Sequence, residues 1–142
     1  MAVEIASEPT EELVDAMARL LPQLSSSGKA LSPAETAELV AQDCLKLFVF
    51  RTDAGTIEGM LSLVLFKIPT GLRAWIEDVV VSEATRGHGA GQQLVEAATQ
   101  YALSVGARTV DLTSRPTREA ANRLYQRCGF VLRETNVYRF AK

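Results

Sequence analysis

Six consecutive residues near the middle of the chain have a composition suited to binding phosphate. They are Arg86, Gly87, His88, Gly89, Ala90 and Gly91. They separate an apolar run, Ile76 to Val81, from a segment whose apolar spacing predicts a helix over Gln92 to Val105. Glycines let the backbone approach an anion, successive N–H groups converge on it, and a helix start adds partial positive charge. With the permanent cation of Arg86, this order predicts a phosphate-binding loop.

Two common phosphate motifs are only partly matched by this loop. The dinucleotide fingerprint needs a third glycine where Gln92 stands, and the P-loop needs a Gly-Lys-Ser/Thr triplet that the sequence lacks. A plain glycine-rich connection between a strand and a helix therefore stays open as the alternative interpretation. His88 also has two interpretations, a solvent-facing loop residue or a weak donor to phosphate.

A second segment, Arg118 to Phe130, completes a pattern with the loop. Together the two segments resemble the GNAT superfamily of acyl-CoA-dependent N-acyltransferases. The first is similar to that family's Arg/Gln-x-x-Gly-x-Gly/Ala loop at Arg86, Gly89 and Gly91. The second is similar to its Asn-x-x-Ala-x-x-Leu-Tyr-x-x-x-Gly-Phe segment at Ala121, Leu124, Tyr125, Gly129 and Phe130, with Arg118 in place of the usual Asn. The resemblance covers roughly residues 74–140.

The resemblance implies that acetyl-CoA is the acyl donor and indicates where it would bind. Its diphosphate would lie on the loop and the helix start, at Arg86, Gly87, His88, Gly89, Ala90, Gly91 and Gln92. The strands Leu72–Val81 and Thr109–Thr113 would splay apart and leave backbone groups free for the amides of pantetheine. These groups would come from Val79, Val80 and Val81. Arg118 would reach the cofactor in place of the asparagine, or pair with Glu119 in water, where such pairs contribute little.

Tyr125 is the residue to which the resemblance assigns proton transfer. When an amine attacks a thioester, a thiolate leaves, and a phenol near the sulfur is a competent acid for protonating it. The alternative interpretation is a core tyrosine on an amphipathic helix. Tyr101 lacks the motif and is predicted to belong to the core only.

The strand before the loop carries two candidates for the base that deprotonates the amine. Glu77 and Asp78 point to opposite faces by the two-residue alternation of a strand. The same alternation predicts that Trp75, Glu77, Val79 and Val81 share one face. If Val79 and Val81 flank the cofactor, Glu77 is the better candidate for the base, directly or through water. A structural hydrogen bond or ion pair of Glu77 is the alternative.

Histidine and cysteine are too scarce for several other catalytic chemistries. His88 is the only histidine, and the spacing of Cys44 and Cys128 fits neither a metal site nor a disulfide framework. No metal is therefore predicted. Cys128 as a covalent nucleophile competes with the more usual interpretation of a small buried apolar residue.

Length and composition favour a single globular domain over residues 1–142. The net charge of −2 gives no basic field for nucleic acid, and no apolar stretch approaches the ~18 residues of a membrane helix. The N-terminus, Met1 to Ile5, carries an acid and no basic start, so no signal peptide is predicted and the cytoplasm is the expected location.

The remaining pattern predicts the elements that position these residues. Strands are predicted over Val3–Ala6, Leu45–Arg51, Ile57–Ile68, Leu72–Val81, Thr109–Thr113, Phe130–Arg133 and Asn136–Phe140. Helices are predicted over Pro9–Leu24, Ser32–Asp43, Gln92–Val105 and Thr117–Cys128, with a break at residues 25–28 after the first and a capping box at Ser32 and Glu35 of the second. This order predicts an α+β fold with a single mixed, mostly antiparallel sheet flanked by helices. It also matches the order expected of the resembled family.

Two functions from different classes follow. The favoured one is an N-acetyltransferase that moves an acetyl group from acetyl-CoA directly to an amine of a small molecule or a peptide. The alternative is a non-catalytic acyl-CoA-binding or sensing module that kept the loop and lost turnover. The acceptor carries no recognisable motif, and the resemblance implies a homodimer.

Overall fold

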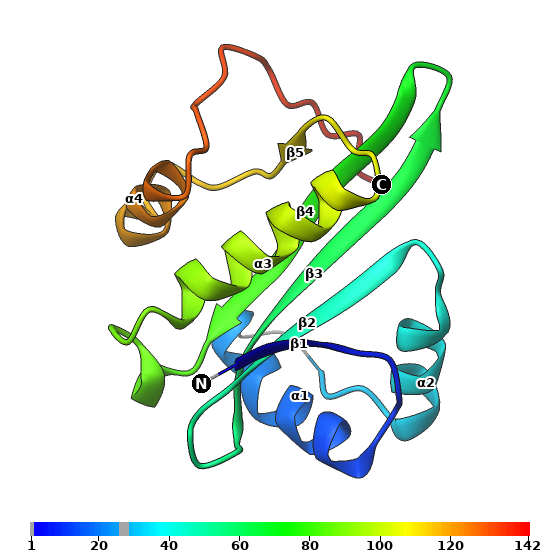
Figure 1. The fold of residues 1–142 in the computed structure, drawn as a ribbon, viewed down its shortest axis with the longest axis vertical. Coiled ribbons are helices and arrows are strands. Elements are labelled where there is room, and N and C mark those ends of the chain that lie inside the picture. The colour runs from blue at the N-terminus through cyan, green and yellow to red at the C-terminus, as the bar shows by residue number, and fades with distance from the viewer. Residues whose placement is uncertain (1, 26–28) are drawn as a thin grey trace.

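One five-stranded mixed sheet organises the chain (Figure 1). The computed structural model describes residues 2–25 and 29–142. The elements are β1 (Ala2–Ala6), α1 (Glu11–Leu24), α2 (Pro33–Ala41), β2 (Leu45–Arg51), β3 (Ile57–Ile68), β4 (Gly71–Val81), a 3-10 turn (Glu83–Thr85), α3 (Ala90–Ser104), β5 (Val110–Asp111) and α4 (Glu119–Arg127). Strands β1 to β4 are antiparallel neighbours and β5 runs parallel to β4, which confirms the predicted α+β class. The predicted break at residues 25–28 lies largely outside the described residues.

Local signals explain where the two N-terminal helices begin. The Thr10 hydroxyl accepts a hydrogen bond from the Leu13 amide at 3.1 Å and caps α1. At α2 the Ser32 hydroxyl accepts from the Glu35 amide at 3.1 Å, while the Glu35 carboxylate accepts from the Ser32 amide at 3.0 Å. The predicted capping box is therefore confirmed, with Pro33 at the first helical position, where its missing N–H costs no hydrogen bond.

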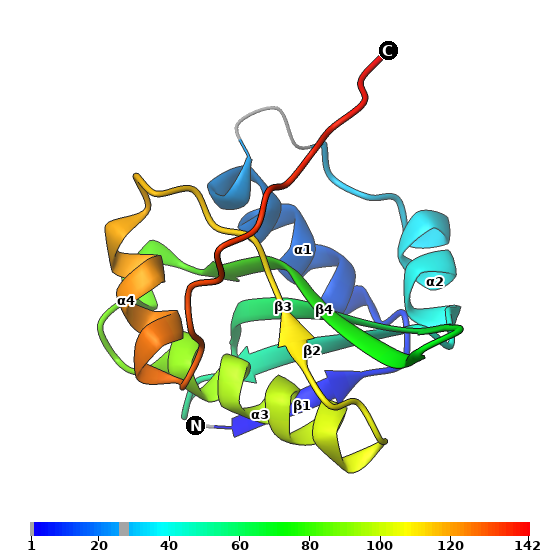
Figure 2. The ribbon, with the colours of Figure 1, turned by 90° about the horizontal axis from the view of Figure 1, so that it is seen from above.

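The helices cover the two faces of the sheet and create two apolar clusters (Figure 2). Helix α3 packs its buried residues Leu94, Val95, Ala98 and Ala102 on one face, against side chains such as Phe48, Phe50, Leu61, Leu63 and Ile76. On the other face, α1 packs Leu13, Ala16, Met17 and Leu20 against Leu47, Val49, Ile57, Met60 and Val80. Tyr101 packs edge-on against Phe48 with ring centroids 6.0 Å apart, as predicted for a core residue.

A β-bulge interrupts the alternation of β4. Ser62 of β3 lies opposite Glu77 and Met60 opposite Val80, so β4 has one more residue than β3 across this stretch. Asp78 within the bulge has φ 52°, a left-handed conformation that aspartate tolerates better than most residues. Val79 packs on the α3 side with Ile76, whereas Val80 packs on the α1 side. The prediction that Glu77 and Val79 share a face is wrong, because the bulge inverts the faces between them.

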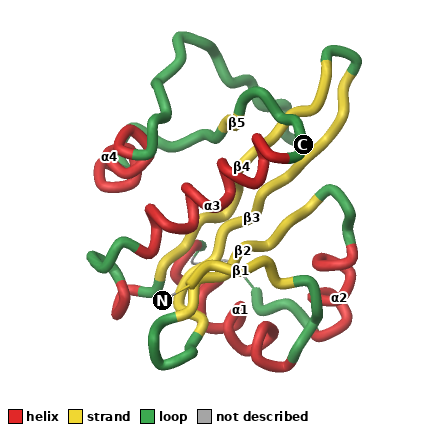
Figure 3. The backbone as a smooth tube through the Cα atoms, in the orientation of Figure 1, coloured by secondary structure: helices red, strands yellow, loops and turns green. Residues whose placement is uncertain are grey.

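The predicted terminal strand pair, Phe130–Arg133 and Asn136–Phe140, does not form. The chain after α4 runs as an irregular, extended segment (Figure 3). Within residues 2–25 and 29–142, its last backbone hydrogen bond to the rest of the chain is from the Phe130 amide to the Tyr125 carbonyl, at 2.9 Å. The β-propensity of the sequence is therefore present without the neighbouring strand that would satisfy it. Strand β5 is likewise shorter than its predicted range of Thr109–Thr113.

Candidate active site

The glycine-rich loop folds as a left-handed turn at the start of α3. Gly87 and Gly89 have φ 87° and 80°, conformations that L-residues rarely adopt, and Gly89 is the N-cap of the helix. Ala90 and Gly91 belong to the first turn of α3, so the helix begins two residues before its predicted start at Gln92. The first helical N–H groups have no partner within a helix, and here they emerge from a turn without side-chain capping. This geometry suits an anion.

Gly91 allows the two motifs to lie close together. A Cβ atom at this position would lie 3.0 Å from Cδ2 of Leu124 on α4, closer than side chains normally pack. The missing side chain therefore lets α4 approach the start of α3. As a result, the segment that carries Tyr125 lies beside the loop.

Arg86 and Gln92 form side-chain hydrogen bonds near the loop, whereas His88 faces solvent. Nε of Arg86 donates to the Val81 carbonyl at 3.3 Å, which ties the loop to the end of β4. The Gln92 amide donates to the Glu96 carboxylate at 2.9 Å. His88 is exposed and does not line the cavity described next. Arg86 and Gln92 do line it.

A large open cavity lies between the loop, β4 and α4. Strand β5 pairs with β4 only at Ala74 and Trp75, so the sheet opens beyond that point. The resulting cavity has a volume of about 1900 Å³. Its walls are residues 76–81 of β4, residues 85–87 and 89–92, residues 112–115 after β5, residues 117–121 with Leu124, Tyr125 and Arg127, the end of α1 and Val137 with Arg139. The predicted cofactor residues Val79, Val80, Val81 and Arg118 are all among them.

Tyr125 lies where the cavity meets the core. It is 8% exposed, and its ring packs against Phe130 with centroids 5.9 Å apart. Burial raises the pKa of the Tyr125 hydroxyl, and the nearby charge of Arg118 offsets part of this effect. The phenol is therefore protonated at neutral pH, as an acid must be. The two interpretations of Tyr125 are compatible, since the ring belongs to the core and the residue also lines the cavity.

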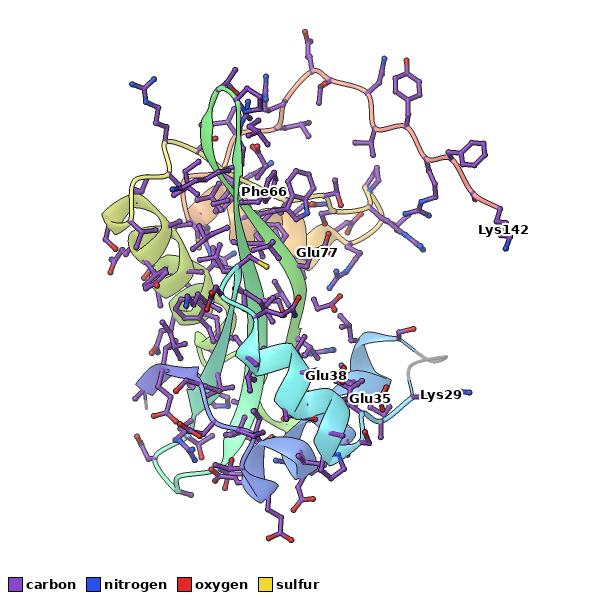
Figure 4. All side chains as sticks on the ribbon, turned by 90° about the vertical axis from the view of Figure 1, so that its right-hand side faces the viewer. Lys29, Glu35, Glu38, Phe66, Glu77 and Lys142 are labelled. Atoms are coloured by element: carbon purple, nitrogen blue, oxygen red, sulfur yellow. The ribbon has the colours of Figure 1, made fainter. Side chains whose placement is uncertain are left out.

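Two adjacent carboxylates of β4, Glu77 and Asp78, border the same cavity. Glu77 is labelled in Figure 4. The Trp75 indole N–H donates to Oε1 of Glu77 at 2.8 Å, which orients this exposed carboxylate. Asp78, within the bulge, has a raised pKa because of partial burial and the neighbouring charge of Glu77. The bulge thus places two neighbouring carboxylates at the point where β4 and β5 separate.

Ser114 is a site residue that the sequence analysis assigned no role. The residue lines the cavity, and its hydroxyl is buried with no hydrogen-bond partner in the described structure. Buried hydroxyls are almost always paired, so an unpaired one beside a cavity is suited to a ligand. The neighbouring turn is held by the Asn122 side chain, which donates to the Arg115 carbonyl at 3.0 Å. No local pattern indicated Ser114, because the burial of a hydroxyl depends on the tertiary fold.

Cys128 has the surroundings of a packing residue. It contacts the α3-facing cluster, and burial raises the pKa of its thiol, which disfavours the nucleophilic thiolate. Across residues 2–25 and 29–142, no group of three or more His, Cys, Asp or Glu side chains could hold a metal ion. In the same ranges, no helix is long and apolar enough to cross a membrane.

Comparison with known proteins identifies the family to which the chain belongs. The model of the acetyltransferase (GNAT) family matches residues 12–130. The chain therefore belongs to the GNAT family of acyl-CoA-dependent N-acetyltransferases, a family whose donor is acetyl-CoA and whose acceptors are amines. The left-handed glycine turn, the open edge of β4 and the unpaired Ser114 hydroxyl all fit such a donor. No curated protein matches the chain.

Solved structures agree on the fold. An Agrobacterium tumefaciens protein provisionally assigned as an acetyltransferase is 27% identical, with a TM-score of 0.84 over 99% of this chain and 100% of that one. Glucosamine-6-phosphate N-acetyltransferase from Arabidopsis thaliana is 22% identical, with a TM-score of 0.77 over the whole of both chains. An aminoglycoside acetyltransferase from an uncultured soil sample is 18% identical, with a TM-score of 0.87 over 99% of this chain and 95% of that one. The last two show the fold alone.

Proposed function

We propose that this protein transfers the acetyl group of acetyl-CoA directly to an amine of a small molecule or a peptide, with Tyr125 as the general acid. The observation that carries the proposal is the position of Tyr125. Its protonated phenol borders the same cavity as the glycine turn and the open edge of β4. A non-catalytic acyl-CoA sensor would have no need for an acid at this place.

The proposed reaction has one bond-forming and one bond-breaking event. The amine nitrogen attacks the thioester carbonyl carbon, a C–N bond forms and the C–S bond breaks. The phenol of Tyr125 gives its proton to the departing sulfur, and a β4 carboxylate takes the proton that the amine loses. The tyrosinate then regains a proton from solvent and the carboxylic acid releases its proton to solvent, so charge and atoms balance over the cycle.

Three parts of the cavity wall would bind acetyl-CoA: the start of α3, the backbone of β4 and Arg118. The diphosphate would lie on the N–H groups at the start of α3, with Arg86 and Gln92 at the rim of the same cavity. Residues 79–81 would bond the pantetheine amides through the backbone edge that β5 leaves uncovered. Arg118 lies at the N-cap of α4, where its charge acts on both the phenol and an anionic donor.

The test is thiol release from acetyl-CoA in the presence of a panel of primary amines, including amino sugars, aminoglycosides, amino acids and peptides. The proposal expects amine-dependent release with one acetylated product, identified by mass. Tight binding of acetyl-CoA with no release across the panel would instead favour the sensor.

Exchanging each β4 carboxylate for its amide distinguishes the two candidate bases. Glu77→Gln is expected to lower kcat about 10²-fold at neutral pH, because the oriented carboxylate takes the amine proton. Asp78→Asn is the matched control, and we expect less than a threefold change. The measurement is steady-state kinetics with the acceptor that the panel identifies. The opposite ranking would move the role of base to Asp78.

Asp78→Asn is also expected to stabilise the fold at neutral pH. A carboxyl with a raised pKa in the folded state loses stability as pH rises from its ordinary value of 3.8 through the folded-state pKa. Asparagine removes that penalty and tolerates φ 52°. The melting temperature should rise by ~1–2 °C at pH 7 and not at pH 3, as measured by circular dichroism. An equal rise at both pH values would contradict this origin.

Ser114→Ala is expected to weaken the donor complex with little effect on folding. The hydroxyl has no partner in the described structure, so its removal costs the protein no hydrogen bond. A neutral hydrogen bond to bound acetyl-CoA contributes about 1 kcal/mol, which predicts a KM for acetyl-CoA that is roughly fivefold higher. Asn122→Ala is the contrasting variant, because it breaks an internal bond and should lower the melting temperature. An unchanged KM in Ser114→Ala would exclude this contact.

A further inference from the structure

The last turn of α1 is bonded directly to the turn that precedes the glycine-rich loop. Oε1 of Gln23 accepts a hydrogen bond from the Glu83 amide at 3.0 Å, although the two residues are 60 positions apart in the sequence. Glu83 begins the 3-10 turn, which is followed by Arg86, the first residue of the loop. Gln23, Thr85 and Arg86 all line the cavity. A side chain of α1 therefore holds the segment from which the loop begins.

The 3-10 turn lacks a cap from its own flanking residue. The first amides of a helical turn have no partner within the turn, and the side chain of the preceding residue commonly supplies one. Here the preceding residue is Ser82, whose hydroxyl instead donates to the Thr85 hydroxyl at 3.3 Å. Within the part of the chain that the structure describes, Gln23 is the partner of the Glu83 amide. Gln23 thus provides, from another helix, the cap that the turn lacks.

Gln23 is held in this orientation by the rest of α1. Its Nε2 donates to the Arg19 carbonyl at 3.3 Å, which leaves Oε1 for the Glu83 amide. The Arg19 guanidinium in turn donates to the Ile57 carbonyl at 3.1 Å and lies 3.5 Å from the Glu58 carboxylate. Both of these partners belong to β3. The 3-10 turn is therefore anchored to a helix that is itself bonded to the sheet.

The loop takes its position from its two ends. On the turn side, the Arg86 amide donates to the Glu83 carbonyl at 3.4 Å, and on the helix side the Gln93 amide donates to the Gly89 carbonyl at 3.0 Å. Between these ends, Gly87 and His88 form no backbone hydrogen bond within residues 2–25 and 29–142. A displacement of the turn would therefore be transmitted to the amides that face the diphosphate.

We propose that Gln23 is a positioning residue for donor binding, which holds the 3-10 turn so that the loop amides converge on the diphosphate. The inference rests on the donor site of the proposed function. Without the bond to Glu83, the turn and the loop would adopt further conformations, and only a fraction of the molecules would be ready to bind. The apparent affinity falls by that fraction. One hydrogen bond of ordinary strength corresponds to a change of about fivefold.

Gln23→Met tests the proposal, because methionine has a similar length and helix propensity but accepts no comparable hydrogen bond. Titrations are followed by amide NMR shifts. We expect coenzyme A and inorganic diphosphate to bind about fivefold more weakly, and pantetheine, which lacks the diphosphate, to bind as in the wild type. Gln42→Met is the matched control and should bind all three ligands as the wild type does. Gln42 is also exposed at the end of a helix, but its amide bonds only to the Leu39 carbonyl and it does not line the cavity.

Two results would overturn the proposal while leaving the proposed function intact. One is equal affinity of Gln23→Met and the wild type for coenzyme A. The other is an equal loss for pantetheine, which would show that the substitution disturbs the whole cavity. Absence of coenzyme A binding to the wild type would instead refute the proposed function and this inference together.

Amide hydrogen exchange in the ligand-free protein gives a readout that does not depend on binding. We expect the Glu83 and Arg86 amides to exchange faster in Gln23→Met than in the wild type. Gln23→Glu keeps an acceptor oxygen at the same reach and should restore the wild-type exchange. The melting temperature should change by less than ~2 °C in both variants, because Gln23 is exposed. Unchanged exchange at Glu83 and Arg86 in Gln23→Met, or faster exchange throughout α1, would contradict a role in positioning the loop.

Discussion

Tyr125→Phe is expected to lower kcat by about 10²–10³-fold while acetyl-CoA still binds with its original affinity. The substitution removes one hydroxyl and keeps the ring, which packs against Phe130 and belongs to the core. Without the proton of the phenol, the leaving thiolate must be expelled unprotonated. The melting temperature should change by less than ~2 °C, as measured alongside initial rates.

The control for this variant is Tyr101→Phe. Tyr101 is also a core-packing tyrosine, but it lies on α3, packs against Phe48 of β2 and does not line the cavity. The kcat of Tyr101→Phe should therefore equal that of the wild type. In the wild type, the raised pKa of Tyr125 keeps the acid protonated, so a loss of rate from its ionisation should appear only above pH 10. Comparable rates for Tyr125→Phe and the wild type would remove the acid from the mechanism.

Gly89→Val is expected to weaken coenzyme A binding by at least ~100-fold. Gly89 has φ 80°, which a β-branched residue strongly disfavours, so the turn must change its conformation. A changed turn directs its N–H groups away from the diphosphate, and losing two charge-assisted hydrogen bonds accounts for about 3 kcal/mol or more. Titration calorimetry with coenzyme A measures the effect.

Gly55→Val provides a matched comparison for backbone strain. Gly55 has φ 86°, a Cβ there would also enter open space, and the residue lies in the β2–β3 turn away from the cavity. Both variants should lose similar stability, so a difference in affinity between them reports the role of the loop. If both bind coenzyme A equally well, backbone geometry at Gly89 has no part in recognition.

The central strands could be predicted from the sequence, because the alternation of apolar residues that marks a strand lies within the strand itself. The bounds of β2 and β3 were correct, since apolar side chains alternate on both sides of a turn at residues 53–55. The start of α3 was placed two residues late, because Gly91 reads as a loop residue. In the fold it is helical and leaves room for Leu124. That contact lies far away in the sequence and has no local signature.

The rest of the site depended on tertiary structure. The bulge at Asp78 carries no glycine to mark it, yet it decides that Glu77 and Val79 lie on opposite faces. Ser114 became a candidate only because the fold buries its hydroxyl without a partner in the described structure. The predicted strands after Phe130 have strand-like composition but no neighbour to pair with in the described chain. Strand propensity reports fit to a sheet, and only the fold shows whether a sheet edge is within reach.

The central claim is that backbone amides at the start of α3 bind the diphosphate of the donor. Amide NMR shifts in the ¹⁵N-labelled protein during a coenzyme A titration test this most directly. We predict that the largest shifts occur at the amides of residues 87–92 and that inorganic diphosphate alone moves the same amides. Saturable binding with these amides unmoved, and the shifts elsewhere, would contradict the account.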